Sequence, residues 1–232
     1  MFRKLLSIIA FGALIVLAVP MDGQALPKLK IDNPDFDFGY VPEGLTVVHP
    51  YWAHNVGTDT MVIYRVRASC RCTAVRPKRD LLAPGDSLVL EMKFDTKKIK
   101  GKVAKHATVE CSDLTREFET LRFTAQVGTS YGVINVTPEE VYLDTIGKTE
   151  QVVTLRNATT LPYLISIASP MAEFMNLSFS SMDLPPRGEI TMTVKTTPEA
   201  PPGEYHASVT LHIEGAQPHN ITIPVLGRSF PK

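Results

Sequence analysis

This chain of 232 residues lacks most of the features that would reveal a chemical activity directly. It has only three cysteines, an odd number that excludes a fully paired disulfide scaffold in a monomer. Lysine plus arginine and aspartate plus glutamate number 24 each, so no net field attracts nucleic acid or an anionic lipid surface. It contains no nucleophile elbow, phosphate-binding loop or HExxH motif. The sequence therefore indicates no catalytic residue, no cofactor and no nucleic-acid partner.

Long apolar runs are also lacking, except at the N-terminus. Arg3 and Lys4 precede the apolar run Leu5–Val19, and Gly23-Gln24-Ala25 supplies small residues for cleavage. The run is shorter than the ~20 residues that a spanning helix needs. It therefore predicts a cleaved signal peptide over residues 1–25 rather than an anchor. We expect a mature chain in the periplasm or at the cell surface, with no stable membrane span.

No segment has a sustained helical period, and short alternating runs recur instead. Met61–Arg67 and the run 87–95 flank a turn at Pro84-Gly85-Asp86, as antiparallel strands do. The residues expected to face a core are Val62, Tyr64, Val66, Leu88, Leu90, Met92 and Phe94. Many such strands predict an immunoglobulin-like β-sandwich. The Cys…Trp…Cys pattern of antibody domains is absent, because the single tryptophan, Trp52, precedes the cysteines.

Residues 28–128 and 131–232 resemble two copies of one unit. Asn55 matches Asn157 and Gly101 matches Gly203, each 102 residues later, while Gly85 matches Gly188 one residue further on. A repeat of this length is a whole domain. The sequence therefore predicts an all-β chain of two tandem immunoglobulin-like β-sandwiches, residues 28–128 with a Cys-x-Cys motif and residues 131–232 without one.

Six short signatures occur in one order within residues 35–113. They are Phe36-x-Phe38-Gly39, Glu43-Gly44, Asn55-Val56-Gly57, Ala68-Ser69-Cys70-x-Cys72-Thr73, Pro84-Gly85-Asp86-Ser87 and Phe94-Asp95-Thr96. In these the chain resembles the bacterial domain-of-unknown-function family fifteen seventy-three, which is allied to hydin- and MSP-like immunoglobulin-type domains. The resemblance implies an exported tandem sandwich and no established activity. The chain departs from the pattern at Arg71, where glycine is usual, and at Cys111.

Cys70 and Cys72 permit three interpretations. Two thiolates one residue apart could bind a soft metal ion, with His106 as a third ligand, although the second ligand pair of a strong zinc signature is missing. Nearby arginines could instead favour thiolates and a readily reduced disulfide. The third interpretation is structural, with the sulfurs packed under a corner between strands.

Cys111 is expected to be a buried free thiol in the core. The strand 61–67 should pair antiparallel with 103–111, which places Cys111 at the opposite end from Cys70 and Cys72. The two ends lie roughly 20 Å apart, beyond the ~7 Å that a disulfide allows between Cα atoms.

Two functional hypotheses remain. The first is a non-enzymatic binding or scaffold protein of the cell envelope that recognises a protein or a glycan. The second is an envelope protein for thiol redox or soft-metal handling that uses Cys70 and Cys72.

Overall fold

A computed structural model describes residues 25–77, 79–128, 131–169 and 172–230. The predicted signal peptide, apart from Ala25, lies outside the described residues. The described elements are eighteen strands, β1 to β18. In this part of the chain, no helix is long and apolar enough to cross a membrane.

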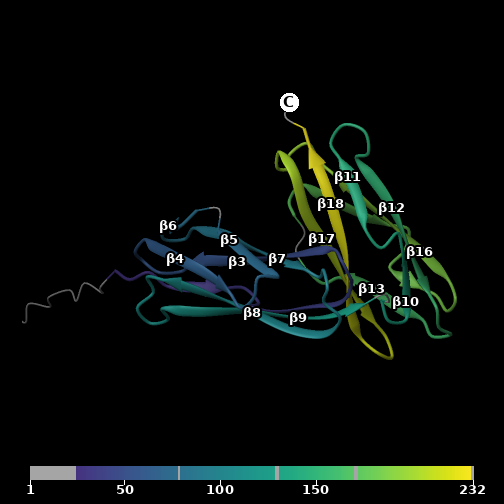
Figure 1. Cartoon of the computed structure of the whole chain (residues 1–232), viewed down its shortest axis with the longest axis horizontal. Coiled ribbons are helices and arrows are strands. Elements are labelled where there is room, and N and C mark those ends of the chain that lie inside the picture. The colour runs from purple at the N-terminus through teal and green to yellow at the C-terminus, as the bar shows by residue number, and fades with distance from the viewer. Residues whose placement is uncertain (1–24, 78, 129–130, 170–171, 231–232) are drawn as a thin grey trace, which may run out of the picture.

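The strands divide between a first half, residues 29–128, and a second half, residues 131–230 (Figure 1). The first half contains β1 (Leu29–Ile31), β2 (Asp35–Pro42), β3 (Thr46–Asn55), β4 (Met61–Ala68), β5 (Thr73–Pro77), β6 (Leu81–Leu82), β7 (Ser87–Asp95), β8 (Gly101–Cys111) and β9 (Phe118–Gly128). The second half contains β10 (Ile134–Thr137), β11 (Val141–Asp144), β12 (Glu150–Asn157), β13 (Tyr163–Ile167), β14 (Met175–Phe179), β15 (Asp183–Leu184), β16 (Glu189–Thr196), β17 (Gly203–Glu214) and β18 (His219–Ser229).

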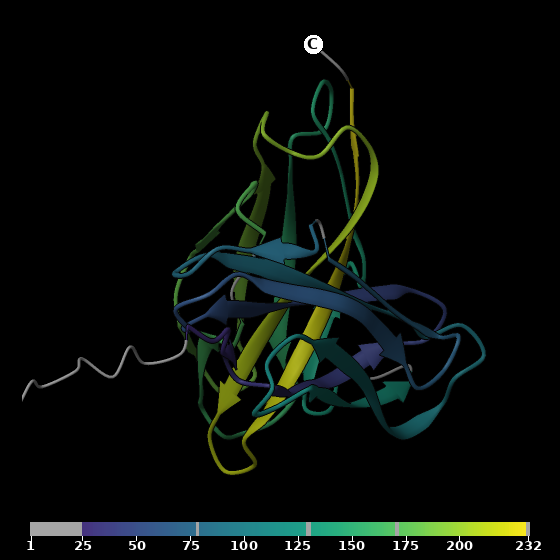
Figure 2. The ribbon, with the colours of Figure 1, turned by 90° about the vertical axis from the view of Figure 1, so that its left-hand side faces the viewer.

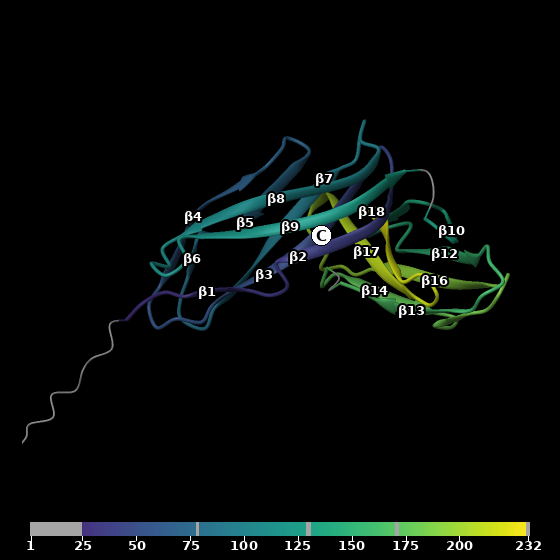
Figure 3. The ribbon, with the colours of Figure 1, turned by 90° about the horizontal axis from the view of Figure 1, so that it is seen from below.

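Each half has a small sheet that packs over its part of one long sheet. The small sheets have the strand orders β1-β3-β7-β5 and β10-β12-β16-β14. The long sheet runs through both halves in the order β15-β13-β17-β18-β2-β9-β8-β4-β6, with β11 paired to β18. Figure 3 shows β9, β2, β18 and β17 together in the middle of the molecule. The chain is thus an all-β protein of the immunoglobulin-like sandwich type, as the sequence predicts.

Two separate buried clusters lie between these layers, one drawn from residues 29–127 and the other from residues 131–225. In the first cluster Phe123 of the long sheet meets Phe94 of the small sheet, with ring centroids 4.9 Å apart. The predicted core positions of β7 are all buried, because alternate residues of a strand face the same layer. A fully buried phenylalanine contributes on the order of 2–3 kcal/mol by burial alone. These rings hold the two layers of the first half together.

The two halves repeat the same register. Ala107 pairs with Leu121 between β8 and β9, and Val209 pairs with Ile223 between β17 and β18, each 102 residues later. Asn55 and Asn157 are both buried, and each donates hydrogen bonds to backbone carbonyls of the equivalent loop in its own half. Their side chains donate to Asp59 O at 2.7 Å and Leu82 O at 3.0 Å, and to Leu161 O at 2.7 Å and Pro185 O at 2.9 Å, respectively. The two asparagines therefore have the same structural role: each holds a loop closed beside the core of its half.

Two details of the sequence interpretation are wrong. In the first part of β4 the core receives Met61 and Ile63, not Val62 and Tyr64, and Tyr64 is 59% exposed. A bulge between Ile63 and Arg65 then changes the side-chain phase, so Val66 packs against the core as expected. In the turn before β16, Gly85 corresponds to Arg187 and not to Gly188. Both residues have positive φ, +80° and +56°, and the repeat keeps its separation of 102 residues there.

Candidate functional site

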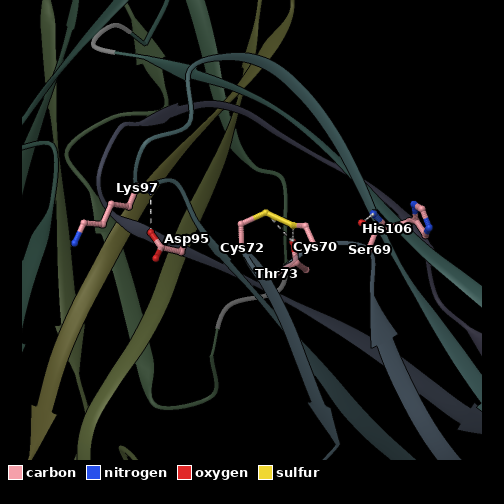
Figure 4. Close-up of a disulfide and its surroundings, with 7 residues drawn as sticks. All are labelled: Ser69, Cys70, Cys72, Thr73, Asp95, Lys97 and His106. Carbon is pink, nitrogen blue, oxygen red and sulfur yellow. Dashed lines mark hydrogen bonds between the residues drawn. A yellow bond between two sulfur atoms is a disulfide. The ribbon is translucent and has the colours of Figure 1, made fainter.

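Cys70 and Cys72 lie in the corner where the chain leaves β4 of the long sheet and enters β5 of the small sheet. They form a disulfide, with Cα atoms 5.3 Å apart (Figure 4). Both residues are half-buried, and Cys72 packs against the first core. The sulfurs thus lie under the corner, in the position that the structural interpretation expects.

Backbone hydrogen bonds hold this corner against the end of β7. The amide of Thr73 donates to Cys70 O at 3.3 Å, and the amide of Asp95 donates to Cys72 O at 2.9 Å. The buried hydroxyl of Thr73 lies 3.4 Å from the sulfur of Cys70 and 3.9 Å from that of Cys72. The corner is therefore fixed by its backbone on both sides of the disulfide.

His106 is brought beside the corner by its backbone. The amide of Ser69 donates to His106 O at 2.9 Å, and the amide of His106 donates to the Ser69 hydroxyl at 3.2 Å. Figure 4 shows the ring of His106 directed away from the sulfurs. Among the described residues, no three histidine, cysteine, aspartate or glutamate side chains are grouped to hold a metal ion. Cys70, Cys72 and His106 thus come close in the fold without converging on one point.

Cys111 lies at the other end of β8, where it pairs with Ile63. It is buried and forms no disulfide, and its thiol donates to Arg116 O at 3.6 Å. Burial raises the pKa of this thiol, so the unreactive protonated form is favoured. Its placement agrees with the predicted strand order.

The disulfide corner has a counterpart in the second half. The amide of Met175 donates to Ala172 O at 2.9 Å and the amide of Thr197 donates to Phe174 O at 2.8 Å, which repeats the bonds around Cys70 and Cys72. Phe174 packs against the second core and contacts Tyr205 edge to face, with centroids 4.9 Å apart. The disulfide therefore occupies the position that an aromatic ring fills in the second half.

The second half contacts the first half through β18 and β2, and its strands cross those of the first half steeply (Figure 2). Strand β18 pairs in parallel with β2 at Ile221 and Tyr40. The buried hydroxyl of Thr222 donates to Phe38 O at 2.6 Å, and Asn220 donates to Asp37 O at 2.7 Å. Backbone pairing and buried hydrogen bonds are directional, so they fix the two halves relative to one another.

Gly39 makes this close approach possible. It lies in the irregular part of β2 and has φ of +63°. A Cβ atom at this position would overlap the carbonyl oxygen of Asn220 in the second half. Glycine is therefore required twice, for the left-handed backbone and for contact with β18.

His49 of β3 is buried at the same junction. Its ring stacks on Phe36 with centroids 3.5 Å apart and meets the edge of Tyr51. Its Nδ1 lies 2.9 Å from the hydroxyl of Ser169 in the second half. Burial lowers the pKa of His49 to about 3, so the ring is neutral near pH 7.

Two hollows lie at the junction, and Pro50 and Trp52 line both of them. The smaller, of about 150 Å³, is lined by β3 and β7 of the first half and by residues 172–174 and β17 of the second. The larger, of about 570 Å³, is lined mainly by residues 32–37 and the adjoining part of β3. We call these two hollows together the junction groove.

Sequence reasoning missed this groove. It used Trp52 only to exclude an antibody-like pattern, and it treated Phe36 and Gly39 as family signatures. The available signal was a lone tryptophan beside Pro50 within an alternating strand. That signal could not indicate a groove, because about half of the residues that line the smaller hollow lie more than a hundred positions after Trp52 in the sequence.

The architecture can now be compared with known proteins. A family model described as "Protein of unknown function (DUF1573)" matches residues 29–127. Residues 29–127 belong to this family. The match covers the first half, including the disulfide corner and the first core. No match was found among curated proteins.

Three solved structures illustrate the range of similar folds. A protein of unknown function from Porphyromonas gingivalis has 13% identity and a TM-score of 0.36, covering 86% of this chain and 99% of that one. An ASH/PapD-like domain of human CEP192 has 18% identity and a TM-score of 0.38, with 52% and 99% covered. The tandem Ig repeats of Dlar have 12% identity and a TM-score of 0.37, with 88% and 100% covered. At these TM-scores none of the likenesses bears on function.

Proposed function

We propose that this protein is an exported, non-enzymatic binding and scaffold protein of the cell envelope, and that it recognises a protein or glycan partner at the junction groove. The observation that carries the proposal is the junction itself. Hydrogen bonds across it and the requirement for Gly39 hold two sandwiches in one arrangement. A fixed concave site between domains is a common place for a ligand.

The composition of the groove supports binding. Trp52 and Phe174 line the smaller hollow, and Phe36 and Trp52 line the larger one. Aromatic side chains dominate the energetics of recognition sites because they bury much apolar area and lose few rotamers. The pKa of His49, the buried histidine beside the groove, is held far from neutrality, so His49 is poorly placed to exchange protons at pH 7. These features favour recognition over proton-transfer catalysis.

The test is capture of partners from a native envelope extract on the immobilised chain. Wild-type protein is compared with Trp52→Ala and with Leu114→Ala, which removes an apolar side chain that is 81% exposed outside the groove. We expect one or more envelope proteins or glycans to bind saturably to wild type and to Leu114→Ala, and at least tenfold more weakly to Trp52→Ala. Equal retention by all three baits, or saturable retention by none, would contradict the proposal.

A second candidate function is thiol–disulfide exchange, favoured by the disulfide between Cys70 and Cys72. A dithiol partner would attack one sulfur to form a mixed disulfide, and its second thiol would then release the reduced pair and leave the partner oxidised. The correspondence of this corner with Phe174 favours a structural role instead. Mass spectrometry after alkylation distinguishes the two, because exchange requires that Cys70 and Cys72 be found both reduced and oxidised in the envelope.

A further inference from the structure

The junction groove has a distinctive charge pattern. Its lining includes five carboxylates, Asp32, Asp35, Asp37, Glu91 and Glu173, and no lysine or arginine. The whole chain is balanced, with 24 residues of each sign. The groove lining therefore gathers carboxylates, while the cations that pair with Asp32, Asp35 and Glu91 lie just outside the lining.

Most of these carboxylates have partners just outside the groove. Asp32 pairs with His54 at 2.9 Å and Asp35 with Arg122 at 3.7 Å, while Asp37 accepts hydrogen bonds from Gly39 and Thr124. The hydrogen bond from Lys30 holds the pKa of Asp32 below its usual range, so Asp32 is ionised at neutral pH. The ion pair of Asp32 with Lys30 spans 3.1 Å and that of Glu91 with Lys93 spans 3.2 Å. All four side chains are at least one third exposed, and exposed ion pairs of this kind contribute little net stability. A partner's cation can therefore displace these lysines at little cost.

Aromatic faces lie beside these charges. Trp52 and Phe174 line the smaller hollow together with Glu91 and Glu173. A guanidinium or ammonium over a tryptophan face is attracted by the ring's quadrupole, and a nearby carboxylate accepts a charge-assisted hydrogen bond from it. Aromatic rings combined with carboxylates recognise a cation attached to an apolar stem.

The dimensions of the groove fit a peptide. A cavity of about 150 Å³ holds a group the size of benzene, which suits the head of one side chain. The larger hollow, of about 570 Å³, is within the usual range for ligand sites and shares Pro50 and Trp52 with the first. A segment that crosses Pro50 and Trp52 would place a cationic side chain in the small hollow and its neighbouring residues at the large one.

From these observations we infer that the junction groove binds an arginine- or lysine-bearing peptide segment of a partner protein, with one cationic side chain between Trp52, Phe174, Glu91 and Glu173. This inference rests on the proposed function and specifies the class of partner. Charge complementarity selects the occupant, because a cationic side chain can replace Lys93 at Glu91 and pair with Glu173, which a neutral glycan cannot do.

Trp52 is the only tryptophan, so its fluorescence reports binding at the groove directly. The purified chain is titrated with a capped nine-residue peptide alternating arginine and serine. A matched peptide carries neutral citrulline in place of arginine, and spermidine and chitohexaose serve as a free amine and a neutral glycan. We expect a saturable fluorescence change with the arginine peptide and at least tenfold weaker binding of the other three.

Variants test the charges. Glu91→Gln combined with Glu173→Gln should weaken binding of the arginine peptide at least tenfold. The matched control combines Glu139→Gln and Glu214→Gln, two exposed carboxylates outside the groove, and should change affinity less than twofold. The inference is overturned if the arginine peptide gives no saturable change at millimolar concentration, if citrulline, spermidine or chitohexaose binds as tightly, or if both double variants behave alike. Partner capture that depends on Trp52 would leave the proposed function standing in each of those cases.

Discussion

Acidification should destabilise the first half through His49. The neutral ring is stacked on Phe36 in the folded state, where burial lowers its pKa to about 3, against 6.5 for the exposed residue. Between these values the unfolded chain binds a proton that the folded chain does not, so stability falls as pH falls below 6.5. Each pH unit corresponds to about 1.36 kcal/mol. From pH 7.5 to pH 5.0 the loss attributable to His49 is therefore about 2 kcal/mol.

The assay is urea unfolding by circular dichroism at pH 7.5 and pH 5.0, for wild type and His49→Phe. Phenylalanine keeps the stack on Phe36 and cannot bind the proton, although it loses the contact with Ser169 at a cost of about 1 kcal/mol at either pH. We expect the variant to lose about 2 kcal/mol less than wild type on acidification. The reasoning is refuted if both proteins show the same pH dependence.

Three further comparisons test the fold by the same unfolding assay. Phe94→Ala should lower the free energy of unfolding by ~3–5 kcal/mol, whereas Lys93→Ala on the outward face should change it by no more than about 0.5 kcal/mol. Similar losses for both variants would mean that the strand phase is wrong. Replacing Cys70 and Cys72 by serine opens a very short loop and should cost about 1.5 kcal/mol, whereas a loss of the whole fold would contradict that estimate. Gly39→Ala should cost clearly more than Gly44→Ala, because both residues have positive φ but only Gly39 abuts Asn220. Equal costs would exclude a close junction.

Much of the fold could be predicted because it depends on local sequence patterns. Alternation fixes the buried face of β7, and the repeated asparagines mark the same loop in both halves. The phase of β4 could not be read in this way, because the bulge after Ile63 depends on pairing with β8. The equivalence of Gly85 with Arg187 was hidden for a similar reason, since the left-handed conformation persists while the residue type changes.

The candidate site was harder to predict. Spacing and strand order correctly predicted that Cys70 and Cys72 lie away from Cys111 and that His106 lies close to the corner. They could not indicate where the ring of His106 points. The junction groove joins β3 and β7 of the first half with residues 172–174 and β17 of the second, and no local pattern indicates which surfaces of two sandwiches meet. Gly39 indicates the contact only when it is known that Asn220 of β18 lies against it.

The fixed junction is the central claim, and a distance measurement between the halves tests it most directly. Spin labels on Leu114→Cys and Ile146→Cys would occupy two of the most exposed positions, one in each half, while Cys111 stays buried and unlabelled. Double electron–electron resonance should then give one narrow distance distribution. A broad or multiple distribution would mean that the halves move independently, and would contradict a groove built between them.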